Sequence, residues 1–261
     1  MSGHSKWSTI KRAKAVTDSK KSAVFTKLAN LITVATREKG IDPDMNFSLR
    51  MAIDKAKSAN MPKDNIERAI KRGAGELDGA QIEELFYEGF GPAKVQFIVK
   101  CLTDNKNRTA SNIRHIFTKH GGALGSVMWN FKQKNIIQLS PQKMAGQAIF
   151  NNQLSITNLE IELIDAGAED IIKEDNNIIV YSKVEDLQKL KTFLENKNIK
   201  IKSAEIKYIA KEKQSISEED KEKIEKFIEE LEECEDVAEH SHNMIFGIVG
   251  SATPDNIRII L

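Results

Sequence analysis

The feature that most constrains the fold of this chain is a change in its hydrophobic period after residue 80. Before that point, apolar residues recur at the spacing of amphipathic helices over 20–39, 44–59 and 62–73. The stretch 73–80 is rich in glycine and small residues, which is typical of a linker. Beyond it, alternating apolar residues predict strands interleaved with further helices. We therefore predict an α+β protein that begins with a helical bundle.

Two groups of strands and helices follow the linker. The central group has the order β-α-β-β-α-β, which is the ferredoxin-like arrangement. Its predicted strands are 135–139, 168–173, 177–181 and 200–208, and its predicted helices are 156–166 and 184–196. The other group opens with strands at 95–101 and 127–131 around a helix at 109–120. An acidic helix at 217–233 and a short strand near 236–243 supply the elements that this unit lacks.

This order predicts that one α+β domain is inserted in another. We expect a basic arm and helical bundle at 1–75, a split α+β domain at 81–133 plus 210–243, an inserted ferredoxin-like domain at 134–209 and a C-terminal extension at 244–261. The end of the extension, from Asn256 to Leu261, has the pattern of a strand without a domain to join.

Charge is distributed unevenly along a chain whose formal net charge is only +1. The first 27 residues contain seven Lys and Arg against Asp18, whereas residues 217–240 contain twelve Asp and Glu against three Lys. A basic arm of this kind is typical of segments that bind a polyanion, most often nucleic acid, and a solvated terminus is the alternative. We expect the acidic helix to be a solvated face or an internal partner for a basic domain.

Two groups of residues are candidates for nucleic-acid binding. Lys and Arg neutralise phosphates and release counterions, and an aromatic ring can stack on an unpaired base. In the arm we expect contacts from His4, Lys6, Trp7, Lys11, Arg12, Lys14, Lys20 and Lys21. A second basic cluster, on a polar loop and the helix that it enters, comprises Lys106, Arg108, Arg114, His115 and Lys119. A solvated helix face is the alternative for the cluster, and packing against the first helix is the alternative for Trp7.

Other classes of protein have weak support. Two cysteines are too few for a disulfide framework, which fits a reducing cytoplasm. No run reaches the roughly 18 apolar residues of a membrane span, and the start lacks a signal or transit peptide, so we expect a cytoplasmic protein with no membrane partner. His240 and His242, with Cys234, only faintly resemble a metal site, and no catalytic motif is present. We predict no enzymatic activity, metal, cofactor or small-molecule substrate.

Specific motifs lie between residues 3 and 170, within a longer family resemblance that covers residue 2 to about 243. They are Gly3-His4-Ser5-Lys6-Trp7, Ile10-Lys11, Phe25-Thr26-Lys27-Leu28, residues 57–70 (Lys-Ser-Ala-Asn-Met-Pro-Lys-Asp-Asn-Ile-Glu-Arg-Ala-Ile), Tyr87-Glu88-Gly89-Phe90-Gly91-Pro92, Thr103-Asp104-Asn105-Lys106-Asn107-Arg108-Thr109 and Ala166-Gly167-Ala168-Glu169-Asp170. Together these stretches resemble the YebC/PmpR family, whose eukaryotic relative is the mitochondrial translational activator of cytochrome c oxidase.

This resemblance implies a helical N-terminal domain and two α+β domains, one ferredoxin-like and inserted in the other. Family members are generally described as DNA-binding transcriptional regulators. More recent work points to ribosome-associated translation factors that ease elongation through proline runs, and no catalysis is implied. The resemblance assigns nucleic-acid contacts to His4, Lys6, Trp7, Lys11, Lys14, Lys20, Lys21, Lys106, Arg108 and Arg114. Arg12 and Lys119 are added from charge alone.

The sequence departs from the family pattern near its end. Ala210 stands where many relatives have proline, 237–243 follows the usual ending loosely, and 244–261 extends past it. Phosphate contacts serve duplex DNA and ribosomal RNA equally, so the choice between DNA and the ribosome as partner stays open. A rival interpretation is an interaction protein that works through the acidic helix and uses the arm for solubility.

Overall fold

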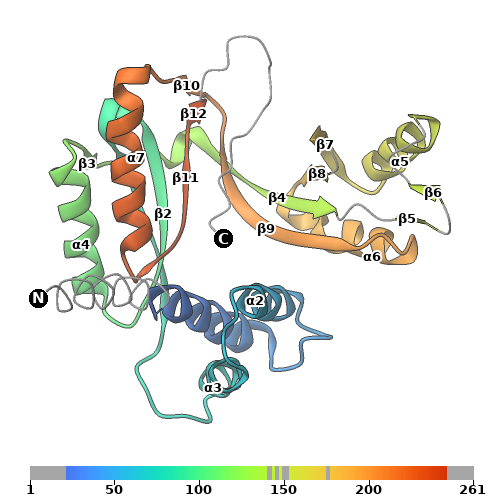
Figure 1. The fold of residues 1–261 in the computed structure, drawn as a ribbon, viewed down its shortest axis with the longest axis horizontal. Helices are drawn as coiled ribbons and strands as arrows, with labels where there is room; N and C mark the ends of the chain where they lie inside the picture. The colour runs from blue at the N-terminus through green and yellow to red at the C-terminus, as the bar shows by residue number, and fades with distance from the viewer. Residues whose placement is uncertain (1–21, 140–142, 145–146, 149–152, 175–176, 246–261) are drawn as a thin grey trace, which may run out of the picture. The chain divides into compact units, whose positions relative to one another are not determined.

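The computed structural model describes residues 22–139, 143–144, 147–148, 153–174 and 177–245 (Figure 1). Helices and antiparallel sheets make it an α+β protein, as predicted. Contacts between Cα atoms divide the chain into two compact units. One extends to Met128 and resumes at Glu212, and the other is Trp129–Lys211. The predicted domain boundaries stay a prediction.

A small helical bundle forms the start of the first unit. Residues 22–39 are helical, followed by α2 (Phe47–Ser58) and α3 (Lys63–Gly73). Asn46 fixes the start of α2, because its Oδ1 accepts from Leu49 N at 3.0 Å while its Nδ2 donates to Ala35 O and Gly40 O at 2.8 and 2.7 Å. The bundle core includes Leu28, Ile32, Leu49, Ile53 and Ile66. The three predicted helices are therefore found, with α2 starting three residues later than the pattern indicated.

A four-stranded sheet follows in the first unit. Its order is β11-β2-β1-β3, formed by β1 (Glu83–Phe90), β2 (Gln96–Thr103), β3 (Ala123–Leu124) and β11 (Val237–His242), all antiparallel. Helices α4 (Lys106–Lys119) and α7 (Glu218–Glu233) cover one face of this sheet (Figure 1). Phe97, Phe117 and Phe227 meet edge to face in the core, with ring centroids 4.9 and 5.0 Å apart. The late acidic helix α7 and strand β11 thus join the same core and sheet as β2 and α4.

Smaller elements complete this unit. They are the short helix η1 (Pro92–Lys94) and the parallel pair of β10 (Gln214–Ser215) and β12 (Met244–Ile245). Met244 is buried in the same core as Phe97. The rest of the predicted extension, 246–261, lies outside the described residues. No helix in the described part of the chain is both long and apolar enough to cross a membrane.

The second unit has the ferredoxin-like element order. Its sheet order is β7-β8-β4-β9, from β4 (Phe131–Leu139), β7 (Ala168–Glu174), β8 (Asn177–Ser182) and β9 (Ile201–Ala210), with every pair antiparallel. The helices are α5 (Gln153–Asp165) and α6 (Leu187–Asn196), preceded by η4 (Val184–Asp186), and β5 (Lys143–Met144) pairs with β6 (Gln147–Ala148). Leu139, Leu163, Val180 and Leu190 lie in its core. The predicted strands and helices of this group are found with shifts of a few residues.

Two parts of the strand prediction are wrong. Strand β1 has no counterpart among the predicted strands, and 127–131 is no strand, because Met128–Asn130 forms the short helix η2. The carboxylate of Glu88 on β1 accepts hydrogen bonds from Val127 N and Met128 N at 2.7 and 2.6 Å. These amides are therefore unavailable for a sheet, and Phe131 instead opens the single strand β4.

A mostly buried histidine makes the first unit sensitive to acid. His242 on β11 packs against the Phe97 ring at 5.9 Å, and burial, with a smaller effect of His240, lowers its pKa to about 4. An unfolded histidine takes up its proton near pH 6.5, so between pH 6.5 and 4 the unfolded state binds more protons than the folded state. We expect the free energy of unfolding to fall by about 2–3 kcal/mol as pH decreases across this window.

Urea unfolding followed by circular dichroism at several pH values measures this loss. His242→Gln removes the titrating group and is expected to flatten the curve between pH 6.5 and 4, although carboxylates still titrate at its lower end. An unchanged pH dependence in the variant would show that His242 is not the source.

Candidate nucleic-acid interface

The predicted arm contacts His4, Lys6, Trp7, Lys11, Arg12, Lys14, Lys20 and Lys21 lie outside the described residues. The last cation of the arm, Lys27, is described and lies on the helix over 22–39. Its ammonium group donates to the backbone carbonyl of Glu232 at the C-terminal end of α7, where helix carbonyls carry partial negative charge. Burial lowers the pKa of Lys27. Lys27 therefore joins two parts of the first unit and is committed to the fold.

The second basic cluster is built on the start of α4. Asn105 caps the helix, because its side-chain Oδ1 accepts from Arg108 N at 3.0 Å. The backbone N–H of Asn105 donates to Thr103 Oγ1 at 2.9 Å. The helix therefore begins at Lys106, three residues before the predicted start at Thr109. Lys106 and Arg108 belong to its first turn and are not loop residues.

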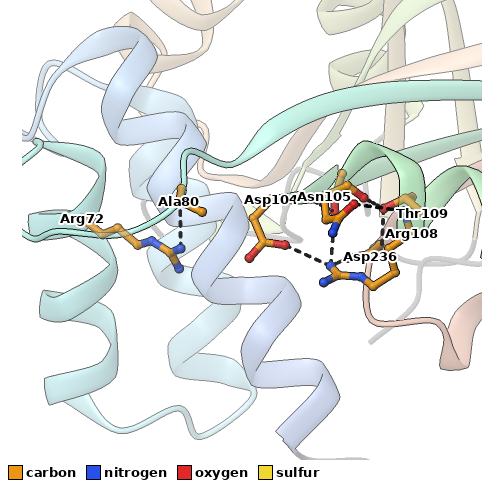
Figure 2. Close-up of polar contacts among 8 residues, drawn as sticks. Arg72, Ala80, Asp104, Asn105, Arg108, Thr109 and Asp236 are labelled. Carbon is orange, nitrogen blue, oxygen red and sulfur yellow. Dashed lines mark hydrogen bonds and ion pairs between the residues drawn. The ribbon is translucent and has the colours of Figure 1, made fainter.

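Arg108 is held by carboxylates on two segments (Figure 2). Its Nη2 lies 2.9 Å from Asp236 Oδ1, 3.0 Å from Asp104 Oδ1 and 3.3 Å from Thr103 Oγ1. The second oxygen of Asp236 accepts from the hydroxyl of Thr109 at 2.9 Å, and Asp236 O accepts from Leu102 N at 2.8 Å. Asp236 thus connects the end of β2, the start of α4 and the start of β11.

The other cations of the cluster differ in their pairing. Lys106 Nζ lies 2.7 Å from Glu83, and Lys119 Nζ lies 2.8 Å from Glu230 on α7. Hydrogen bonds from Lys119 and then His120 lower the pKa of Glu230. Arg114 is exposed and makes no ion pair within the described residues. Of the five residues of the cluster, Lys106, Arg108 and Lys119 are therefore paired internally, whereas Arg114 and His115 are exposed, and contact of the cluster with nucleic acid stays a prediction.

Two further arginines, on α3, are absent from the predicted sites. Arg68 is exposed, with no ion pair in the part of the chain that the structure describes. Arg72 is half-buried, and its Nη2 donates to Ala80 O at 3.0 Å (Figure 2). Both line an open groove against the helix over 22–39. The only signal in the sequence is their spacing of four residues, which neighbouring Lys and Glu side chains obscure.

The cysteine and histidine candidates are buried in the fold. Within the described ranges, no three His, Cys, Asp or Glu side chains gather so that they could hold a metal ion. His240 lies 3.4 Å from Glu232 and is almost fully buried. Burial raises the pKa of the Cys101 and Cys234 thiols, which keeps them protonated and unreactive.

Comparison with known proteins identifies relatives over nearly the whole chain. Two family models match, the TACO1/YebC protein N-terminal domain over residues 5–76 and the TACO1/YebC second and third domain over 82–244. A probable transcriptional regulatory protein of Thermoanaerobacter pseudethanolicus is 45% identical, covering 94% of this chain and 97% of that protein. A probable transcriptional regulatory protein of Persephonella marina is 45% identical, covering 91% of this chain and 93% of that protein. The crystal structure of a conserved hypothetical protein from Aquifex aeolicus superposes with a TM-score of 0.71 at 39% sequence identity. The match covers 89% of this chain and 94% of that protein.

The two carboxylates on Arg108 allow a matched test of its role. Asp236→Asn removes the charge from a side chain that is 9% exposed, so we expect the free energy of unfolding to fall by about 1–3 kcal/mol. Asp104→Asn removes the other charge from a side chain that is 39% exposed, and we expect a loss below about 0.5 kcal/mol. Urea unfolding measures both, and equal losses would contradict the role of Asp236 as the joint between β2, α4 and β11.

Proposed function

This chain belongs to the TACO1/YebC family, and we propose that it regulates gene expression by binding nucleic acid, without catalysing a reaction. The observation that carries the proposal is the concentration of six Lys and Arg against Asp18 in residues 1–21. Such an arm neutralises phosphates and releases counterions, which supplies affinity without reading sequence. The curated relatives named probable transcriptional regulatory proteins support a regulatory role.

The cluster on α4 offers a second set of phosphate contacts. The side chains of Lys106, Arg108 and Lys119 remain 58%, 50% and 53% exposed, so a phosphate can approach each of them while it stays bound to its carboxylate partner. Those partners reduce the local positive potential, and Arg114 is the cation without such a partner in the described residues. We propose that this cluster orients a nucleic acid whose main attachment is the arm.

DNA-binding transcriptional regulation is the first form of this proposal, and binding to ribosomal RNA as a translation factor is the second. One observation favours the second form. Recognition helices contact base edges with the residues of their first turn. In α4 the first turn is joined to Asp236 and Asp104 through Arg108 and Thr109, which commits it to the fold. Contact through phosphates alone serves either partner but reads no base sequence. Structured RNA additionally offers unpaired bases on which Trp7 can stack.

Salt titration tests the role of the arm. If five phosphates are neutralised, the logarithm of the affinity for duplex DNA should fall with the logarithm of salt at a slope of about −4 to −5. The combined variant Lys11→Ala, Arg12→Ala and Lys14→Ala should reduce the magnitude of this slope by about 2–3. Fluorescence anisotropy over a salt series measures the slopes.

A matched control removes three cations from α7. Lys221, Lys223 and Lys226 pair with carboxylates of the same helix, so the combined alanine variant changes net charge equally and should leave the slope unchanged. A flat salt response of the unmodified protein, or equal effects of both variants, would remove the arm from the mechanism. If nucleic-acid binding is unaffected by both variants and only the variant of α7 loses regulatory activity in the cell, the rival interpretation as an interaction protein would be favoured.

Sucrose-gradient sedimentation with crosslinking separates the two forms of the proposal. Migration with ribosomes and crosslinks to ribosomal RNA would support the translation factor. Crosslinks to discrete DNA fragments, with the protein remaining at the top of the gradient, would support the transcriptional regulator. Absence of both would contradict nucleic-acid binding in the cell.

A further inference from the structure

The helix over 22–39 and α3 enclose a groove beside a very close helix contact. Thr33 Oγ1 donates to Ala69 O at 3.1 Å, and a Cβ atom on Gly73 would lie only 2.5 Å from Thr33 O. The contact therefore requires glycine at position 73 and fixes the spacing of the two helices. The open groove between them has a volume of about 530 Å³. Its lining includes Ser22, Phe25, Thr26, Asn65, Arg68 and Arg72.

The described lining of the groove includes two cations, Arg68 and Arg72. Arg68 and Arg72 are four residues apart on α3 and so share one helix face. No carboxylate belongs to the described residues that line the groove, and the neighbouring Glu67 pairs with Lys63 at 3.3 Å. The bond from Arg72 to Ala80 O holds that guanidinium in place and leaves its other donors available. Two guanidinium groups in this setting favour a ligand with more than one negative charge.

We propose that this groove binds a segment of single-stranded nucleic acid, with phosphates on Arg68 and Arg72. The inference rests on the proposed function and adds a second contact to it. Half-buried Phe25 offers an apolar surface to a sugar or base beside the two cations, a combination typical of single-strand sites. The volume lies within the range of about 300–1,000 Å³ for small-ligand pockets, which is enough for part of a single strand.

The sequence connects this groove to the arm. Lys20 and Lys21 come immediately before Ser22, which lines the groove. If the arm binds a strand, the groove is close to it along the chain, so the second contact costs less entropy than an independent one would. The cations of the arm and of α3 then neutralise successive parts of one polyanion.

Fluorescence anisotropy with a labelled oligouridylate of about 20 nucleotides, and with duplex DNA of similar length, tests the inference. Arg68→Ala is expected to weaken single-strand binding about three- to tenfold and to reduce the magnitude of the salt slope by about 0.7. Duplex binding should change less than about twofold. Lys71→Ala is the matched control, since Lys71 is exposed on the same helix, does not line the groove and carries the same charge.

The outcomes separate this inference from the proposed function. If the unmodified protein binds neither probe, the proposed function fails and the groove assignment fails with it. If it binds but Arg68→Ala and Lys71→Ala have equal effects, the groove assignment alone is wrong. An equal loss of duplex binding would overturn the single-strand assignment. Thermal unfolding checks that both variants are folded, and Arg68→Gln, which keeps the side-chain stem, repeats the test with less change in packing.

Discussion

The carboxylate of Asp236 is the contact on which the arrangement of the first unit depends. It binds Arg108 and Thr109, 128 and 127 residues earlier, and its backbone carbonyl accepts from Leu102 N. A single acidic residue therefore fixes where β2 ends, where α4 starts and where β11 begins. Removing one partner of such a pair leaves the other uncompensated, so we expect substitutions at Asp236 or Arg108 to destabilise the first unit. Bringing together residues that are more than 120 positions apart costs conformational entropy. The contacts of Asp236 and the packing of Phe97, Phe117 and Phe227 offset this cost.

Contacts within the fold decide which basic residues have an internal partner. Counted along the sequence, Lys27, Lys106, Arg108 and Lys119 all contribute to positive patches. In the fold each has an acceptor, namely Glu232 O, Glu83, the pair Asp104 and Asp236, and Glu230. The acidic helix is therefore an internal partner for part of the basic surface, one of the two roles predicted for it. Exposed Arg114 and Arg68 differ, because no ion pair within the described residues neutralises them.

Local periodicity predicted the helical bundle, the ferredoxin-like order and the late helix and strand, because each buries a regular apolar face. It missed β1, since Glu83 and Glu84 start that strand and pair with Lys106 and Lys100 in the fold. It divided β4 wrongly because Glu88, some 40 residues away, binds the amides of Val127 and Met128. The pairing of Lys119 with Glu230 and of Arg108 with Asp236 joins residues more than 100 positions apart. Such contacts have no local signature, so the sequence indicated where the cations are but not which of them form ion pairs within the fold.

This distinction decides how the protein can bind a polyanion. Cations that hold the fold together are fixed in place, so they orient a ligand but add little net charge to its site. The arm has the opposite composition, with six cations and one anion in 21 residues, so we expect any affinity that it supplies to depend on salt. The α3 groove differs from both, because none of its described lining residues is a carboxylate and Gly73 fixes the spacing between α3 and the helix over 22–39. A site that is both charged and rigid selects the shape of its ligand as well as its charge, which neither the arm nor the α4 cluster can do alone.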